Sequence, residues 1–243
     1  MRLKAPVYRL KRQARLLSRK SGIPLHKALD EIAATMGYRS WSQLANSERS
    51  NERPAARILA SLKPGTLVTL AARPGHGKTM LGLEILVEAA MRGRSAGFVS
   101  SEFSLFEIRK KMSSLGGETS ESEDRLRLCL SDRIAADYVV EQFSNAISGT
   151  VVVIDFLQVM DQHRSDPPLG DQIRQLKLFA SSKQLSIVFL SQIHRSFNSQ
   201  ERSVPDFRDM RKTNPLDLRL FDVGYFLHDG VLQARTFSER PVL

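Results

Sequence analysis

The chain has 243 residues, of which 42% are hydrophobic and 26% charged, a balance typical of globular proteins. Its length suits one medium-sized domain together with a small second one. No run approaches the roughly 18 consecutive apolar residues of a membrane helix, and the basic N-terminus lacks the apolar core of a signal peptide. Cys129 is the only cysteine, which excludes an internal disulfide and a thiolate zinc cluster. We therefore expect a cytoplasmic protein that does not act at a membrane.

The formal net charge is +10, and positive residues gather near the N-terminus. Every charged residue from Arg2 to Lys27 is lysine or arginine, and Asp30 is the first acid. Local clustering of positive charge favours a polyanionic partner, nucleic acid above all. The clustering does not separate DNA from RNA or from an acidic protein.

Residues 1–47 are predicted to form a small, basic module of three helices. Between Val7 and Lys20 apolar residues recur at helical spacing, and the lysines and arginines fall outside that stripe. Pro24 can start a second helix, whose broad apolar stripe ends at Gly37. The run Ser40-Trp41-Ser42-Gln43 fits a capping box for a short third helix. Three such helices could bury their apolar stripes together.

Residues 48–56 are polar, contain a proline and show little periodicity, so we predict a linker to a larger domain over residues 57–243. In that domain, short apolar runs typical of strands lie at 66–72, 96–100, 150–156 and 186–190. Helical patterns lie between them at 78–91, 105–115, 122–147 and 171–183. Such alternation predicts an α/β fold with a mostly parallel sheet. Asp229-Gly230 between two further strand-like segments predicts a C-terminal antiparallel hairpin.

The segment between the first predicted strand and the following helix carries a phosphate-binding pattern. The run Ala72-Arg73-Pro74-Gly75-His76-Gly77-Lys78-Thr79 matches the P-loop G-x-x-x-x-G-K-[ST], except that an alanine replaces the first glycine. Gly75 and Gly77 would let the backbone curl so that successive N–H groups point inward, at the positive end of a helix. A chance glycine-rich turn is the alternative, and the strand before and the helix after argue against it.

Three side chains are predicted to act on a bound nucleotide and its metal. Lys78 would place an ammonium group on the β- and γ-phosphates, and the Thr79 hydroxyl would bind Mg²⁺. Asp155 follows four apolar strand residues, which places its carboxylate at the carboxyl edge of the sheet as a second Mg²⁺ ligand. A strand-ending aspartate without a special role is the alternative. We predict that residues Arg73 to Met80 bind ATP and that Thr79 and Asp155 bind Mg²⁺.

Two further polar residues follow predicted strands of the same sheet. Glu102 lies one crossover after Lys78 and could orient and deprotonate the attacking water. It could equally be an acid favoured by the N-terminus of the next helix. Gln192 could sense the γ-phosphate and pass its presence to a loop, or simply cap its strand.

Four stretches in this order resemble the DnaB branch of the RecA-like ATPases, namely AARPGHGKT (71–79), SSEFS (100–104), VVVIDFLQVM (151–160) and LSQIHRS (190–196). The run IDFLQVM is similar to that family's D-[YF]-L-Q-L-M core, and LSQIHR to its L-S-Q-L-N-R. Arg208 to Arg211 resembles the family's S-D-L-R, and an alanine at the position of Ala72 also occurs in that family. The similarity covers about residues 57–237.

The resemblance implies a RecA-like P-loop fold that hydrolyses ATP in DNA replication. Glu102 would be the catalytic base, acting beside Lys78, and Gln192 would couple the nucleotide state to DNA-contacting loops. Such proteins form hexameric rings that close on single-stranded DNA, with ATP bound between subunits. Our first hypothesis is therefore an ATP-dependent DNA helicase or translocase that works as a homo-oligomer.

The departures from the family pattern support a second hypothesis. The family ends with a strand carrying a Lys-x-Arg pair that reaches the neighbour's nucleotide, whereas residues 232–236 here contain Arg235 alone. Either Arg235 acts alone as an arginine finger, or the finger is lost and hydrolysis is slow. The second hypothesis is a nucleotide-switched regulatory ATPase without unwinding activity, whose N-terminal helices recognise DNA or a protein. A small-molecule kinase is a weaker alternative, because the sequence has no obvious lid with arginines for an acceptor phosphate.

Basic and aromatic residues after the strand at 186–190 are candidates for contact with DNA. Arg195, Arg208 and Arg211 could grip the phosphate backbone, or could be solvated surface charge. Phe197 and Phe207 could stack on bases, or could belong to the core.

Overall fold

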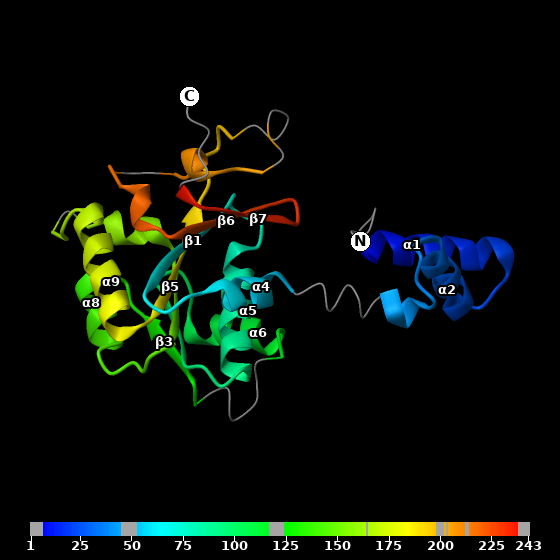
Figure 1. The fold of residues 1–243 in the computed structure, drawn as a ribbon, viewed down its shortest axis with the longest axis horizontal. Helices are drawn as coiled ribbons and strands as arrows, with labels where there is room; N and C mark the ends of the chain where they lie inside the picture. Colours follow the sequence, from blue (N-terminus) through cyan, green and yellow to red (C-terminus); the bar gives the residue numbers. More distant parts are fainter. Residues whose placement is uncertain are drawn as a thin grey trace. The chain divides into compact units, whose positions relative to one another are not determined.

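A computed structural model describes residues 7–44, 53–116, 124–163, 165–197, 202, 204–211 and 214–237 (Figure 1). The chain divides into two compact units, Met1–Arg53 and Pro54–Leu243, and each is considered by itself. Across the described ranges, no helix combines the length and the hydrophobicity that a membrane span requires.

The first unit is built from amphipathic helices. They are α1 (Val7–Ser21), α2 (Leu25–Thr35) and one helical turn over residues 41–44. Leu10, Ala33 and Leu44 form the buried core, and Trp41 packs against it. The Trp41 N–H also donates to Oδ1 of Asp30 at 2.7 Å, which fixes the start of the third helix against α2.

One of the two hydrogen bonds of the predicted capping box forms, and the other has a different donor. Oγ of Ser40 accepts from the Gln43 N–H at 3.1 Å, as expected. The Gln43 side chain accepts instead from the Arg39 N–H, at 2.7 Å, one residue before the cap. On α1 the basic residues outside the apolar stripe are exposed, namely Lys11, Arg12, Arg15 and Arg19.

The second unit contains one seven-stranded sheet. Its strands are β1 (Thr66–Ala72), β2 (Ala96–Ser100), β3 (Leu126–Leu130), β4 (Val151–Asp155), β5 (Ser186–Gln192), β6 (Val223–His228) and β7 (Val231–Arg235). The strand order is β3-β2-β4-β5-β1-β6-β7, and every neighbouring pair is parallel except β6 and β7. The predicted α/β fold with a C-terminal antiparallel hairpin is confirmed.

Helices cover both faces of this sheet. The α-helices are α4 (Pro54–Ser61), α5 (Lys78–Met91), α6 (Leu105–Ser113), α8 (Ala136–Gln142) and α9 (Leu169–Lys183). Three short 3-10 helices follow strands or loops, η1 (Leu157–Asp161), η2 (Phe207–Asp209) and η3 (Leu218–Leu220). α5 and α6 lie side by side on one face, and α8 and α9 on the other (Figure 1). Strands covered on both faces are mostly apolar, and β4 is buried along its whole length, with four apolar residues before Asp155.

A glycine lets α5 approach the sheet closely. A Cβ at Gly82 would lie 3.1 Å from Cγ1 of Val153 on β4 and 3.1 Å from Cδ1 of Leu190 on β5. A larger residue would push the helix outward. The close approach holds the N-terminus of α5 beside the ends of β4 and β5, where the predicted site lies.

Two sequence predictions are corrected by the structure. Residues 122–147 were expected to hold one or two helices and no strand, but β3 occupies Leu126–Leu130 at the edge of the sheet, and α8 follows it. The predicted linker at 48–56 also ends earlier, because α4 begins at Pro54 and buries Ala55 and Ala56. Proline suits the first turn of a helix, where its missing N–H has no partner to lose.

The hairpin turn has the backbone that its sequence predicts. Asp229 and Gly230 have φ values of 45° and 77°, and His228 pairs with Val231 across the turn. Two consecutive positive φ values match the turn type that joins tightly paired antiparallel strands.

Gly97 on β2 provides a test of how tightly α8 packs on the sheet. A Cβ there would lie 2.3 Å from the ring of Phe143, which is buried beneath α8. We expect Gly97→Ala to lower the free energy of unfolding by about 1–3 kcal/mol, because the ring must move within a packed core. Urea denaturation measures this change. Phe143→Leu in the same chain should restore part of the stability, and equal midpoints for wild type and Gly97→Ala would contradict this packing.

Candidate active site

The predicted site residues come together at the carboxyl edge of the sheet. Asp155 ends β4 in register with Ser100 of β2, and Gln192 ends β5 in register with Ala72 of β1. β6 runs parallel to β1, so His228 reaches the same edge. Open α/β sheets bind their ligands at this edge.

The predicted phosphate loop has the curled backbone that its glycines suggest. Residues 73–77 connect β1 to α5, and Lys78 to Met80 form the first turn of the helix. Gly75 and Gly77 have φ values of 80° and 83°, which residues with a side chain rarely adopt. Gly77 is the N-cap of α5, so its conformation turns the loop into the helix. The first turn of a helix has N–H groups without helical partners, and these are suited to bind phosphate.

Ala72, which stands in place of the first P-loop glycine, belongs to β1 and not to the loop. It is fully buried and pairs with Gln192 on one side and Leu227 on the other. Extended strand backbone suits alanine as well as glycine. The replacement therefore leaves the loop intact.

The two predicted metal ligands are in direct contact. Oγ1 of Thr79 donates to Oδ2 of Asp155 at 2.8 Å, which joins the first turn of α5 to the end of β4. Asp155 is fully buried, and burial raises the pKa of its carboxyl from 3.8 to about 6. The Thr79 hydrogen bond and the charge of Lys78 lower that pKa, while the charge of Glu102 raises it further.

The Asp155 carboxylate is suited to hold a cation. Its second oxygen, Oδ1, is buried and has no hydrogen-bond partner among the described residues. A buried carboxylate oxygen without a partner is costly, and Mg²⁺ prefers carboxylate and hydroxyl oxygens. Thr79 and Asp155 therefore fit the Mg²⁺ that accompanies a nucleotide in a P-loop site.

Lys78 lies beside this carboxylate. Its Nζ is 5.8 Å from the ring centroid of Phe156, the residue after Asp155. Lys78 is only partly exposed, and its ammonium group lies over this ring, just beyond the end of β4. One positive and one negative group thus flank the loop, as phosphate and its metal would require.

Glu102 is exposed two residues beyond β2, and its N–H donates to Oγ of Ser100 at 3.1 Å. The alternative role as a helix N-terminal acid does not fit its position. α6 begins only at Leu105, with Ser104 as N-cap, and Glu107 is the acid of its first turn and completes the capping box. The charge of Glu102 reaches Asp155 across the site.

Gln192 is the last residue of β5 and is tied to the segment that follows η2. Its Oε1 accepts from Nη1 of Arg211 at 3.1 Å, and its carbonyl accepts from the Arg211 N–H at 2.7 Å. Gln158 of η1 strengthens this junction, since its Nε2 donates to the Arg211 carbonyl at 2.7 Å and to Oγ of Ser191 at 3.1 Å. Gln158 lies within the motif IDFLQVM, but no role was predicted for it from the sequence. A polar side chain in an otherwise apolar run was the available signal.

Arg73 makes a second link from the phosphate loop. Its Nη2 donates to the carbonyls of Arg195 and Phe197, at 2.8 Å and 3.1 Å. The sequence predicts Arg73 as one of the nucleotide-binding residues. In the structure its side chain holds the segment that leaves β5.

The three arginines considered for DNA contact have different surroundings. Arg195 is exposed, and Arg211 is exposed but held by Gln192. Arg208 is paired with Asp206 at 2.7 Å, which offsets its charge. Arg195 follows β5, Arg208 lies within η2, and Arg211 follows η2.

The two phenylalanines considered as stacking surfaces are in the core. Phe197 and Phe207 are each 4% exposed. Phe197 packs edge-on against the His228 ring, and Phe207 against the Phe226 ring. Stacking on a base needs an exposed ring face. The stacking alternative is therefore wrong for both residues.

Comparison with known proteins finds a resemblance to one family of helicases. The family model described as the DnaB-like helicase C-terminal domain matches residues 133–228, a stretch that includes Asp155 and Gln192. The chain resembles the DnaB-like helicases. The loop at 73–77 and Glu102 precede the matched stretch, so this match does not include them.

One relative and two solved structures illustrate the DnaB-like similarity. A probable plasmid replicative DNA helicase of Chlamydia muridarum is 27% identical over 186 residues, which are 64% of this chain and 41% of the relative. A solved structure described as an ATPase domain superposes with a TM-score of 0.56 at 20% identity, over 68% of this chain and 70% of that one. A DnaB-like replicative helicase, described with its interactions with primase, gives 0.57 at 16% identity, over 90% and 66%. The chain spans about two fifths of the length of the curated relative.

Proposed function

We propose that this chain is a DnaB-like ATPase that hydrolyses ATP and moves along single-stranded DNA in replication. The observation that carries the proposal is the Thr79–Asp155 contact of 2.8 Å, set between a glycine loop and Lys78. Residues Arg73 to Met80 would hold the triphosphate, and Thr79 and Asp155 would hold Mg²⁺. Bound there, Mg²⁺ supplies positive charge that offsets the charge on the phosphate oxygens.

Glu102 is proposed as the base for hydrolysis. It is exposed at the same edge, close enough to Asp155 for its charge to affect that carboxyl. An exposed carboxylate at this place can accept a proton from a water that attacks the γ-phosphate. Lys78 would stabilise the negative charge on the transferred phosphoryl group.

Gln192 is proposed to couple nucleotide state to DNA binding. An amide facing the γ-phosphate can exchange its present partner, Arg211, for a phosphate oxygen. Because the Arg211 backbone is also fastened to Gln192 and Gln158, a change at Gln192 would shift the segment that carries the exposed guanidinium. Arg73 would transmit movement of the phosphate loop to Arg195 in the same way.

A homo-oligomeric ring with ATP between subunits is part of this proposal. Arg235 is exposed at the end of β7, the outermost strand of the sheet, where it could reach a neighbour's nucleotide. An arginine supplied by a neighbour stabilises charge in the transition state. Turnover would then depend on assembly.

The test is ATP turnover by the full chain with and without a poly(dT) oligonucleotide, at several salt concentrations. We expect single-stranded DNA to stimulate turnover, and the stimulation to weaken as salt rises, because bound phosphates release counterions. Arg211→Ala should lower the ratio of stimulated to basal turnover. It should also reduce the slope of log DNA affinity against log salt concentration by about 0.7, the share of one phosphate contact on a single strand. Arg174→Ala is the matched control, since Arg174 lies on α9 and pairs with Asp171.

Turnover that ignores DNA at every salt concentration would contradict the motor and favour the second candidate, a nucleotide-switched DNA- or protein-binding regulator. The observation that favours this candidate is the sequence of β7, where Arg235 is the single basic residue. Mass measurement with a non-hydrolysable ATP analogue and the oligonucleotide separates the two. A motor should assemble into a ring with both ligands, whereas a switch should change its partner or oligomeric state with nucleotide alone.

A further inference from the structure

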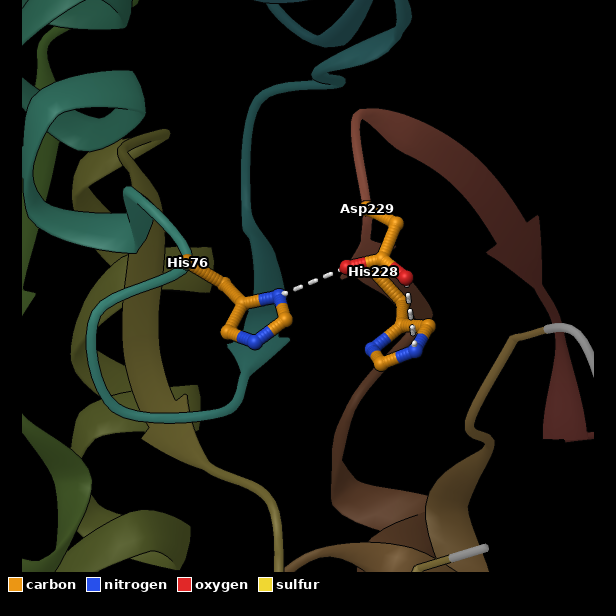
Figure 2. Close-up of side chains that lie close together, drawn as sticks. All are labelled: His76, His228 and Asp229. Carbon is orange, nitrogen blue, oxygen red and sulfur yellow. Dashed lines mark ion pairs between the residues drawn. The ribbon is translucent and has the colours of Figure 1, made fainter. Parts of the chain in front are cut away.

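The phosphate loop meets the β6–β7 turn in a cluster of two histidines and one aspartate. Figure 2 shows His76 from the loop facing His228 and Asp229 from the end of β6. Nδ1 of His76 lies 3.7 Å from Oδ1 of Asp229, and Nε2 of His228 lies 3.5 Å from Oδ2. One ligand atom from each residue lies within 4.8 Å of those of the other two. Three groups that commonly bind metals therefore converge from two separate segments.

His228 lacks the partners that a buried imidazole normally has. It is 5% exposed, and within the described ranges neither ring nitrogen has a hydrogen-bond partner. Buried polar groups in proteins are nearly always hydrogen-bonded or bound to an ion. A buried nitrogen that faces two other ligand atoms without a bond indicates that a further partner belongs between them.

The arrangement of the rings fixes the orientation of His228. The His76 and His228 rings are stacked, with centroids 5.0 Å apart and an interplanar angle of 12°. The Phe197 ring packs edge-on against His228 at 5.3 Å and holds it in place.

We propose that His76, His228 and Asp229 bind one divalent transition-metal ion of the Zn²⁺ class. Two imidazole nitrogens and one carboxylate form a common ligand set for Zn²⁺, and a water can take the fourth position. Mg²⁺ and Ca²⁺ prefer oxygen ligands only. Bonds of about 2.0–2.2 Å separate neighbouring ligand atoms of a tetrahedral site by about 3.5 Å, and each imidazole lies near that distance from one oxygen of Asp229.

The site can close and can be reached from solvent. The Asp229 side chain is 76% exposed and that of His76 is 26% exposed, so both can adjust by the roughly 1 Å that tighter coordination needs. Asp229 also sits in a two-residue turn whose backbone is held by the pairing of His228 with Val231. The ion would enter on this open side and rest against the buried ring.

A bound ion would fasten the phosphate loop to the β6–β7 turn. His76 lies midway between Gly75 and Gly77, the residues on which the loop's shape depends. The proposed ion uses neither Thr79 nor Asp155 and needs no nucleotide. It is therefore a second metal site, whose existence does not depend on the ATPase proposal.

The test is equilibrium titration of Zn²⁺ into the full, tag-free, nucleotide-free chain, in competition with a chromophoric chelator. We expect each chain to bind one Zn²⁺ ion strongly. Asp229→Asn and His76→Ala should each weaken binding by about 100-fold or more, above the 10–100-fold that loss of an outer partner costs. The Asp229 side chain is largely exposed, so Asp229→Asn should leave the packing of His228 against Phe197 and His76 unchanged. Co²⁺ in place of Zn²⁺ should give the visible absorption of a four-coordinate nitrogen and oxygen site, and this signal should be lost in both variants.

Two controls separate the cluster from other sites. His163→Ala removes an exposed histidine elsewhere in the chain and should leave the binding of one Zn²⁺ ion unchanged. Asp155→Asn should also retain it, since Asp155 belongs to the predicted Mg²⁺ site. The proposal is overturned if wild type binds no equivalent of Zn²⁺, if Asp229→Asn and His76→Ala bind it as wild type does, or if Asp155→Asn abolishes it.

Discussion

Lys78→Ala is expected to lower ATP turnover by about 10²–10³-fold, the cost of removing one preorganised group that stabilises transition-state charge. Lys78 is the first residue of α5, and its charge lies near Asp155, where the phosphates of a nucleotide would bind. Alanine is a good helix former, so the first turn of α5 should persist. Steady-state hydrolysis with saturating ATP and Mg²⁺ measures the effect, with and without single-stranded DNA.

The control for Lys78 is Lys63, a lysine beyond the opposite end of β1. Lys63 is exposed and precedes β1 at its amino end, away from the loop. Lys63→Ala should leave turnover within about twofold of wild type, because surface charges away from a site contribute little. Equal turnover in Lys78→Ala and wild type would contradict the assigned loop. If folded wild type shows no saturable binding of ATP, the proposal of a nucleotide site as a whole is wrong.

The features that the sequence predicts well are those with a local cause. The strand at β4 is a run of apolar, β-branched residues, and the loop before α5 has a fixed order of glycine, lysine and threonine. Asp229-Gly230 sets its own turn through two positive φ values. In each case the residues that determine the structure are neighbours in the chain, so a short window holds the information.

The features that the sequence misses depend on contacts between distant segments. β3 reads Leu-Arg-Leu-Cys-Leu, which alternates as an edge strand does, but Leu126 and Leu130 are also four residues apart and suit a helix face. Only the pairing with β2 decides between them. Phe197 and Phe207 follow basic residues in the chain, and only the packing of β6 shows that both are buried.

The sequence predicts which residues form the candidate site better than it predicts the hydrogen bonds that join the site to other segments. Thr79 and Asp155 could be paired from the sequence because the carboxyl ends of parallel strands share an edge. The link from Arg73 to the segment after β5 could not, because nothing near Arg73 in the chain specifies a partner 122 residues away. The cluster of His76 with His228 and Asp229 is hidden for the same reason.

Asp155→Asn is expected to change activity and stability in opposite directions. Loss of the carboxylate should lower ATP turnover by about 10²-fold or more, since a charged ligand of the predicted Mg²⁺ site is removed. The same change should stabilise the ligand-free protein. Burial raises the Asp155 pKa from 3.8 to about 6, and one pH unit of pKa difference corresponds to about 1.4 kcal/mol, so the ionised carboxylate destabilises the fold by about 3 kcal/mol at neutral pH. Asparagine has the same shape and carries no charge to bury.

The pH dependence distinguishes this cause from a general improvement in packing. Because the folded-state pKa lies above the unfolded value, the penalty is absent well below pH 4, grows as the unfolded chain ionises, and is complete above the folded pKa of about 6. The gain from Asp155→Asn should therefore be about 3 kcal/mol at pH 8 and about half of that at pH 5. Urea denaturation with a chelator present measures both values. A gain that does not change between pH 5 and pH 8, or a loss at pH 8, would show that the carboxylate is not held at a free-energy cost and would weaken its assignment as a site prepared for a cation.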